Sequence, residues 1–259
     1  MTKRKSTRRK QVLIGAGIVV MMLVLAGCRP VTRHTIEPTS GAVTPQVTPL
    51  ALPTKEAESE PGAIGNDGQQ GFTAQGRPFR GNPKALVTIE EFSSYQCTFC
   101  ARHFRETYPQ LMSNYVESGR VHYVFWDFPL PSQPQAFQAA EAANCAGQVA
   151  GANAYWAMHD LIMARQADWS GQVNTDDIFK QYAGELDLEQ AAFDRCLDSE
   201  ETRALVEASL AEANARGVDV TPTFFINGEP MIGAQPYPIF KLVLDIILPN
   251  LASTGGLSE

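Results

Sequence analysis

The stretch that decides the fold is VTIEEFSSYQCTFC, which occupies residues 87–100. Its apolar, β-branched beginning predicts a buried strand from Ala85 to Phe92, and a helical pattern begins at Cys97. A thiol at the first position of a helix is stabilised as a thiolate by the helix dipole and by unpaired N–H groups. A second cysteine three residues on can attack a mixed disulfide formed at the first one. Cys97 and Cys100 are therefore the smallest set of residues that can carry out thiol–disulfide exchange.

The residues that follow assign a role to each cysteine. Positions separated by three or four residues define one face of a helix over residues 97–116, and on that face lie Cys100, Phe104, Tyr108, Leu111 and Tyr115. We therefore expect Cys100 to be the buried, resolving thiol. Cys97 is expected to be the exposed, attacking thiol with a low pKa.

Two other interpretations of this cysteine pair are a structural disulfide and half of a zinc site. Zinc usually needs a second ligand pair with its own short spacing. His103 follows Cys100, but no second pair appears nearby in the sequence. The pattern favours redox chemistry, and we expect neither a metal ion nor a cofactor.

The first 27 residues have the pattern of a signal peptide. Six basic residues precede an apolar run over residues 12–27, which is shorter than the ~20 residues of a membrane span. The run ends in Leu25-Ala26-Gly27-Cys28, which resembles a bacterial lipobox with Cys28 as the lipidated residue. An uncleaved anchor is the alternative. Both interpretations place the rest of the chain outside the cytoplasm, anchored to the outer face of the cytoplasmic membrane or in the periplasm.

Removal of the signal peptide makes the chain strongly acidic. It leaves 15 basic residues against 28 acidic ones, a net charge of −13. Such a charge argues against binding to nucleic acid and against electrostatic binding to anionic lipid. Contact with the membrane is therefore expected through a lipid on Cys28.

The rest of the chain divides by composition and periodicity. Residues 28–71 are rich in Pro, Thr, Ser and Gly and cannot bury enough apolar area to fold, so they predict a disordered tether. A strand over residues 121–126 completes a strand–helix–strand unit, and Asn227-Gly228 predicts a hairpin turn near the end of the chain. The expected parts are an α/β first part at 72–132, a helical insertion at 133–216, an α/β second part at 217–251 and a flexible tail at 252–259.

Four cysteines remain if Cys28 carries a lipid. The short spacing favours a bridge between Cys97 and Cys100, which leaves Cys145 to pair with Cys196. This second bridge would be structural and would close a loop of about 50 residues. The alternative is two buried free thiols.

These motifs resemble the DsbA-like thiol–disulfide oxidoreductases of the thioredoxin superfamily over about residues 77–251. The resemblance rests on an acid six residues before the cysteine pair, on Thr221-Pro222 opening a late strand, and on the FING motif at 225–228 followed by GAQ at 233–235. A helical insertion is typical of the DsbA branch. The resemblance implies an α/β thioredoxin fold with an inserted all-helical subdomain.

The resemblance also implies roles for individual residues. Glu91 matches the acid beneath the redox cysteines, where a raised pKa would let it relay a proton to or from Cys100. Pro222 matches a cis proline beside the disulfide, and Thr221 before it would bind the backbone of an extended substrate. Thr98 and Phe99, between the two cysteines, would also contact the substrate.

The function that follows is an extracytoplasmic protein-disulfide oxidoreductase that forms disulfides in exported, cysteine-containing proteins. The family implies a membrane partner that reoxidises it, of the DsbB or vitamin K epoxide reductase-like type. Phe99 gives the Cys97 thiolate no hydrogen-bond donor, and Thr221 also occurs in isomerase-type relatives, so a reductase or isomerase with the same site is an alternative. A redox-silent surface lipoprotein with two structural disulfides is a third interpretation.

Overall fold

The computed structural model describes residues 69–254, so the signal peptide, Cys28 and nearly all of the expected tether lie outside the described residues. The strands are β1 (Gln70–Phe72), β2 (Pro78–Gly81), β3 (Val87–Ser93), β4 (Val121–Asp127), β5 (Thr223–Ile226) and β6 (Glu229–Ile232). The helices are α1 (Thr98–Glu106), α2 (Tyr108–Leu111), the π-helix η1 (Met112–Val116), α3 (Ala136–Ala164), α4 (Gln166–Trp169), α5 (Thr175–Glu185), α6 (Gln190–Asp198), α7 (Arg203–Ala215) and α8 (Tyr237–Thr254).

The strands form one sheet in the order β1-β2-β4-β3-β5-β6. β3 and β4 are parallel, as the predicted strand–helix–strand unit requires, and every other neighbouring pair is antiparallel. β3 lies inside the sheet, with Val87, Ile89 and Phe92 fully buried. Its apolar, β-branched sequence suits a strand that is covered on both faces.

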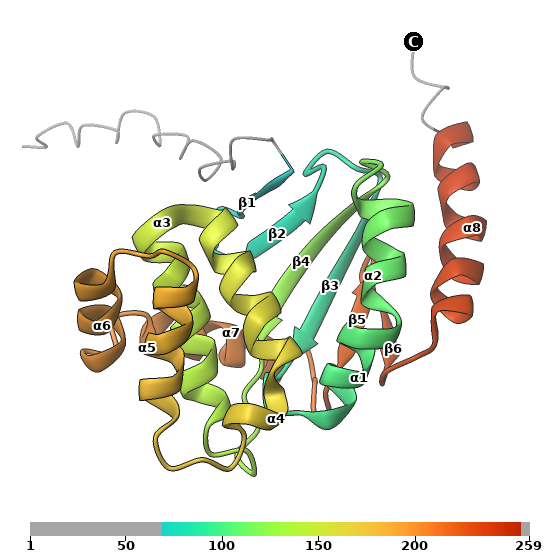
Figure 1. Cartoon of the computed structure of the whole chain (residues 1–259). Coiled ribbons are helices and arrows are strands. Elements are labelled where there is room, and N and C mark those ends of the chain that lie inside the picture. The colour runs from blue at the N-terminus through green and yellow to red at the C-terminus, as the bar shows by residue number, and fades with distance from the viewer. Residues whose placement is uncertain (1–68, 255–259) are drawn as a thin grey trace, which may run out of the picture. The chain divides into compact units, whose positions relative to one another are not determined.

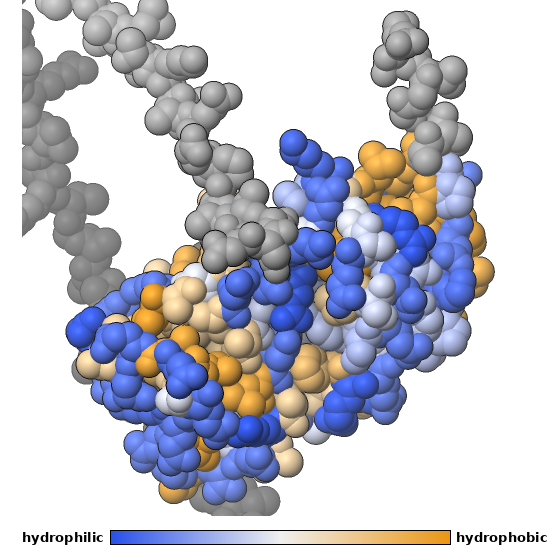
Figure 2. All heavy atoms as spheres, turned by 45° about the horizontal axis from the view of Figure 1, so that its top comes forward, coloured by the Kyte–Doolittle hydropathy of each residue, from blue (hydrophilic) through white to orange (hydrophobic). Residues whose placement is uncertain are grey.

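The helices separate into two groups around this sheet. Figure 1 shows α3 to α7 gathered at one side of the molecule and α8 at the other, with the sheet between them. The surface of α8 carries exposed apolar side chains, Leu242 and Ile246 among them. Figure 2 shows apolar surface at the right of the molecule, where α8 lies. Within the part of the chain that the structure describes, no helix is both long and apolar enough to cross a membrane.

The helix that follows the cysteine pair is interrupted near Pro109. α1 ends before Thr107, α2 contains Pro109, and η1 continues to Val116. Proline has no N–H to donate to the carbonyl of Arg105, and its ring would clash with that carbonyl in a regular helix. The expected face is buried nonetheless, because Tyr108, Leu111 and Tyr115 are all at most 5% exposed.

Some boundaries differ from those predicted. The folded part begins at Gln70, inside the segment assigned to the tether, because β1 pairs with β2. Such a short strand has no periodicity of its own and forms through its partner. At the other end, α8 continues to Thr254, three residues past the expected end of the second α/β part.

Candidate redox active site

Cys97 lies where β3 and its following loop meet the first turn of α1. It is the N-cap residue of α1, and its carbonyl accepts a hydrogen bond from the N–H of Ala101 at 3.0 Å. Its thiol donates to the carbonyl oxygen of Thr221 at 3.4 Å. The pKa of Cys97 is lowered to about 6 by a hydrogen bond from Cys100 and by the backbone N–H groups of Phe99 and Cys100, against the opposing effect of burial.

Cys100 lies one turn further along α1 and is fully buried. Burial raises its pKa well above the ordinary value, and the neighbouring Cys97 thiol raises it further. The two thiols are free in the structure, and their pKa values are shifted in opposite directions. The lower pKa therefore belongs to Cys97, the thiol expected to attack.

The exposure of Cys97 differs from the prediction. A position at the tip of a helix suggested an accessible thiol, yet the residue is only 5% exposed. The loop before β5 brings Thr221 against the sulfur, and the side chain of Gln166 donates to the Cys97 carbonyl at 3.0 Å. Both contacts come from residues more than 60 positions away, so a local helical pattern could not reveal them.

Glu91 is the buried acid of the site. It is 3% exposed, and its carboxylate accepts a hydrogen bond from the hydroxyl of Tyr123 on β4. Burial raises the pKa of Glu91 to about 7, although the hydrogen bond from Tyr123 opposes the rise. Glu90 belongs to the opposite face, where it forms an ion pair with Arg216 at 2.9 Å. Glu91 can therefore gain and lose a proton near neutral pH.

The loop before β5 forms a wall of the site. The Thr221–Pro222 peptide bond is cis. The Pro222 carbonyl accepts a hydrogen bond from the N–H of Gly233 at 2.8 Å, which fixes the loop to the end of β6. The Thr221 carbonyl, which contacts the Cys97 thiol, is thereby held in place.

The residues between the two cysteines are exposed. Phe99 is 57% exposed, and the guanidinium of Arg102 lies 5.2 Å from its ring centre. Thr98 is exposed beside it. The flanks of the Thr221–Pro222 loop add two more exposed apolar side chains, Val220 and Ile232. Neither residue was predicted to belong to the site, although their neighbours Thr221 and Gly233 lie in the predicted motifs.

Three further residues of the site were missed. Tyr123 holds Glu91, while Gln166 donates to the carbonyls of Tyr95 and Cys97 at 2.6 and 3.0 Å. Gln96, directly before Cys97, donates to Ser170 at 3.2 Å. The Tyr123 contact joins β4 to β3, and the two glutamine contacts join the helical insertion to the cysteine loop. Nothing in the local pattern around these residues distinguishes them.

His103 belongs to the core and not to the reacting groups. It is 2% exposed and packs against the rings of Phe224 and Phe240, whose centres lie 4.7 and 5.6 Å from its own. Burial lowers its pKa to about 3, so the imidazole is neutral. Among residues 69–254, no group of three Cys, His, Asp or Glu side chains is arranged to hold a metal ion.

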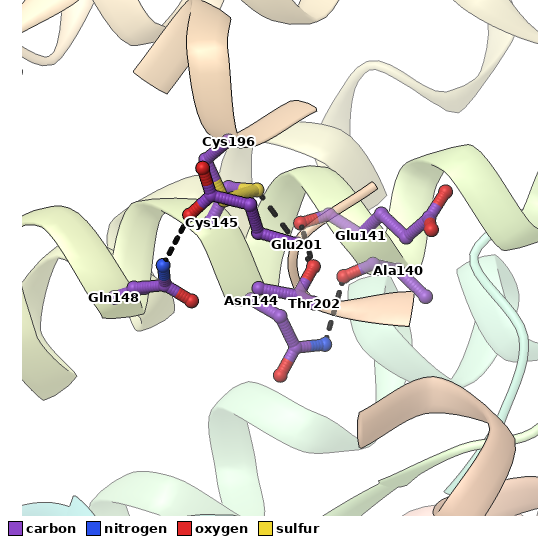
Figure 3. The surroundings of a disulfide bond; sticks show 8 residues. All are labelled: Ala140, Glu141, Asn144, Cys145, Gln148, Cys196, Glu201 and Thr202. Atoms are coloured by element: carbon purple, nitrogen blue, oxygen red, sulfur yellow. Dashed lines mark hydrogen bonds between the residues drawn. A yellow bond between two sulfur atoms is a disulfide. The ribbon is translucent and has the colours of Figure 1, made fainter. Parts of the chain in front are cut away.

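The other two cysteines form a disulfide within the helical insertion. Cys145 of α3 and Cys196 of α6 are bonded, with their Cα atoms 5.8 Å apart. Figure 3 shows the bond beside Thr202, whose hydroxyl lies 3.7 Å from the Cys145 sulfur and donates to the carbonyl of Glu141 at 3.2 Å. This is the pairing that the cysteine spacing favours.

Comparisons with known proteins place this geometry in a family. A thioredoxin family model matches residues 73–245. The chain is 32% identical over 164 residues to Na(+)/H(+) antiporter NhaA 3 of Salinispora tropica, which covers 63% of this chain and 23% of the antiporter. It is 27% identical over 149 residues to the "Putative protein-disulfide oxidoreductase" of Rickettsia felis, which covers 57% of this chain and 52% of that protein. The chain thus spans about half, or less, of the length of these curated relatives.

A solved structure extends the comparison to the fold. Alpha-DsbA1 of Wolbachia pipientis superposes with a TM-score of 0.63 at 21% identity, covering 71% of this chain and 96% of that chain. At that identity the likeness shows the fold alone. The predicted thioredoxin fold with an inserted helical subdomain is confirmed.

Proposed function

The chain belongs to the thioredoxin family, and from that premise we propose that it is a protein-disulfide oxidoreductase that reacts through Cys97 and Cys100. The observation that carries the proposal is the difference between the two thiols. The pKa of Cys97 is lowered to about 6, whereas that of Cys100 is raised. A pair with one ionised and one protonated sulfur can form a mixed disulfide at the first and resolve it with the second.

We assign the oxidising direction to this site. A substrate thiolate attacks Cys97 of the Cys97–Cys100 disulfide, forms a mixed disulfide and releases Cys100 as a thiolate. A second substrate thiolate attacks the substrate sulfur of the mixed disulfide, which forms the substrate's own disulfide and releases Cys97 as a thiolate. Two electrons pass from the substrate to the cysteine pair. The low pKa of Cys97 supports this direction because it stabilises the reduced form.

Glu91 supplies the proton that the Cys100 thiolate needs. Cys100 is fully buried, so its leaving thiolate requires a nearby donor, and Glu91 has a pKa of about 7. The acid gives its proton when the disulfide opens and takes one back when the pair is reoxidised. Its hydrogen bond with Tyr123 keeps the carboxyl in position.

The setting of this activity is part of the proposal. Export through the signal peptide and anchoring through Cys28 would place the site among exported, cysteine-containing substrates. The Cys145–Cys196 disulfide supports an oxidising compartment, where such bonds persist. Each turnover consumes the Cys97–Cys100 disulfide. A quinone-linked membrane protein of the DsbB or vitamin K epoxide reductase-like type would restore it.

The reduction potential tests the direction of the reaction. The protein is equilibrated in buffers of reduced and oxidised glutathione, and the fraction of Cys97–Cys100 disulfide is counted by mass after alkylation. A potential nearer to about −120 mV than to about −270 mV is expected for an oxidant. A potential near about −270 mV would make the protein a reductase or isomerase with the same residues.

A further inference from the structure

A polar groove beside the cysteine loop has no role in the exchange chemistry described above. It has a volume of about 550 Å³ and lies between the start of α3, the loop at 170–174 and the first turn of α5. Amide and carboxyl side chains dominate its lining, with Gln135, Gln138, Gln172, Asn174, Asp176 and Asp177 among them. We call it the amide groove.

Gln96 connects the amide groove to the reacting cysteine. Its side chain accepts a hydrogen bond from the N–H of Gln135 at 2.9 Å and donates to Ser170 at 3.2 Å. Gln135 in turn donates to the carbonyl of Gln172 at 2.8 Å and accepts from the N–H of Gly171 at 3.0 Å. The groove is therefore built onto the residue directly before Cys97.

The charged side chains that line the amide groove are both acidic, and both lie in the first turn of α5. Asp176 and Asp177 line it, and no Lys or Arg does. The Oδ1 atom of Asp176 has no hydrogen-bond partner among the described residues. The nearest cation along α5, Lys180, forms its ion pair with Asp198 at 2.6 Å. A cationic group entering the groove would find two carboxylates and several amide oxygens.

We propose that the amide groove binds a basic side chain, Lys or Arg, of the substrate polypeptide close in sequence to its reacting cysteine. This inference rests on the proposed function, because it places the substrate by its mixed disulfide with Cys97. Gln96, the neighbour of Cys97, contacts Gln135 of the groove lining, and an extended chain advances about 3.3 Å per residue, so we place the basic side chain roughly two to four positions from the substrate cysteine. The site thus prefers substrates with a positive charge at that distance.

Peptide substrates test the preference directly. Oxidised protein is mixed with two-cysteine peptides that are identical except for Lys, Gln or Glu at two, three or four positions on either side of the first cysteine. The rate of reduction of Cys97–Cys100 is followed by acid quenching and mass counting. We expect Lys to exceed Glu by about fivefold at one or more of these positions, as partly exposed ion pairs allow, and 0.5 M salt should reduce the ratio.

Variants of the groove separate its effect from the peptide's own reactivity. D176N/D177N should bring the Lys-to-Glu ratio close to one, because it removes both carboxylates from the groove lining. The control, D187N/E212Q, removes the same number of carboxylates from exposed positions outside the groove lining and should keep the wild-type ratio. Q138K, which adds a cation to the lining without touching the carboxylates, should lower the ratio as well.

The outcomes distinguish this inference from the proposed function. Exchange without a charge preference, or with a preference that D176N/D177N and Q138K leave unchanged, overturns the inference and leaves the oxidoreductase intact. Absence of exchange with every peptide contradicts the proposed function instead. If the D176N/D177N protein does not fold, the Q138K ratio alone decides.

Discussion

The two cysteine pairs of this protein hold the same chemical group in opposite states, one free and one bonded. Cys97 and Cys100 lie at the start of a helix, above a buried acid and beside a backbone carbonyl, and their pKa values are displaced in opposite directions. Cys145 and Cys196 lie within two helices of the insertion and are joined to each other. The difference teaches that the reactivity of a cysteine depends on the backbone and charges around it, because all four residues are buried.

The largest effect expected from this comparison concerns exchange activity. Cys97→Ala should abolish disulfide exchange, because it removes the sulfur that forms the mixed disulfide with the substrate. Cys145→Ala/Cys196→Ala should keep most of the activity, since neither residue touches the site. Oxidation of a reduced, unfolded test protein measures both. Comparable losses in the two variants would show that the pairs are not functionally separate.

A large difference is also expected within the reactive pair itself. After mild reduction, iodoacetamide at pH 7 should label Cys97 far faster than Cys100. The labelling rate of Cys97 should rise with pH through a midpoint of about 6, because its pKa is lowered to that value by hydrogen bonds to the sulfur. Peptide mass mapping follows each site. Equal rates for the two thiols would remove the assignment of attacking and resolving roles.

The Cys145–Cys196 disulfide is expected to stabilise the folded chain. Cys145 and Cys196 are separated by 51 positions, and a loop of that size corresponds to about 4 kcal/mol of stabilisation in the chain-entropy model. Cys145→Ala/Cys196→Ala should therefore lower the free energy of unfolding in urea by about that amount. Cys97→Ala/Cys100→Ala serves as the control for losing two cysteines. A variant as stable as the wild type would mean that the bridge has no structural role.

A smaller change in the free energy of unfolding, with the opposite sign, is expected for Glu91→Gln. Its pKa is about 7 in the folded chain and about 4.5 when unfolded, so burial of the carboxyl costs stability as pH rises from about 4.5 to above 7. Glu91→Gln removes this decline and should raise the free energy of unfolding at pH 8 by up to about 3 kcal/mol. It should also slow exchange. Urea titrations at pH 4.5 and pH 8 measure the difference, and a Glu91→Gln protein that is less stable at pH 8 would contradict it.

Parts of the fold with a strong local pattern were predictable from the sequence. The buried strand β3 and the hairpin at Asn227-Gly228 both follow from residue types. Asn227 and Gly228 both have positive φ angles, as this turn requires. β1 and β2 were missed because three or four residues carry too little periodicity.

The site was predictable to a similar extent. The cysteine pair and the loop at Thr221 have short sequence signatures, and the offset before Cys97 distinguishes Glu91 from Glu90. Tyr123 and Gln166 reach the site only through sheet pairing and through the docking of the helical insertion. Long-range contacts of this kind also bury Cys97, which the local pattern had suggested to be exposed.

The edges of the sheet have a consequence for the proposed reaction with unfolded polypeptides. An exposed strand offers unpaired N–H and C=O groups, onto which any extended polypeptide can add as a further strand. Here the edge strands are β1, of three residues, and β6, of four, and β6 carries Pro230 and Glu229. Proline removes one donor from the edge and glutamate adds charge. In the proposed function, these features would keep the sheet from aggregating with its unfolded substrates.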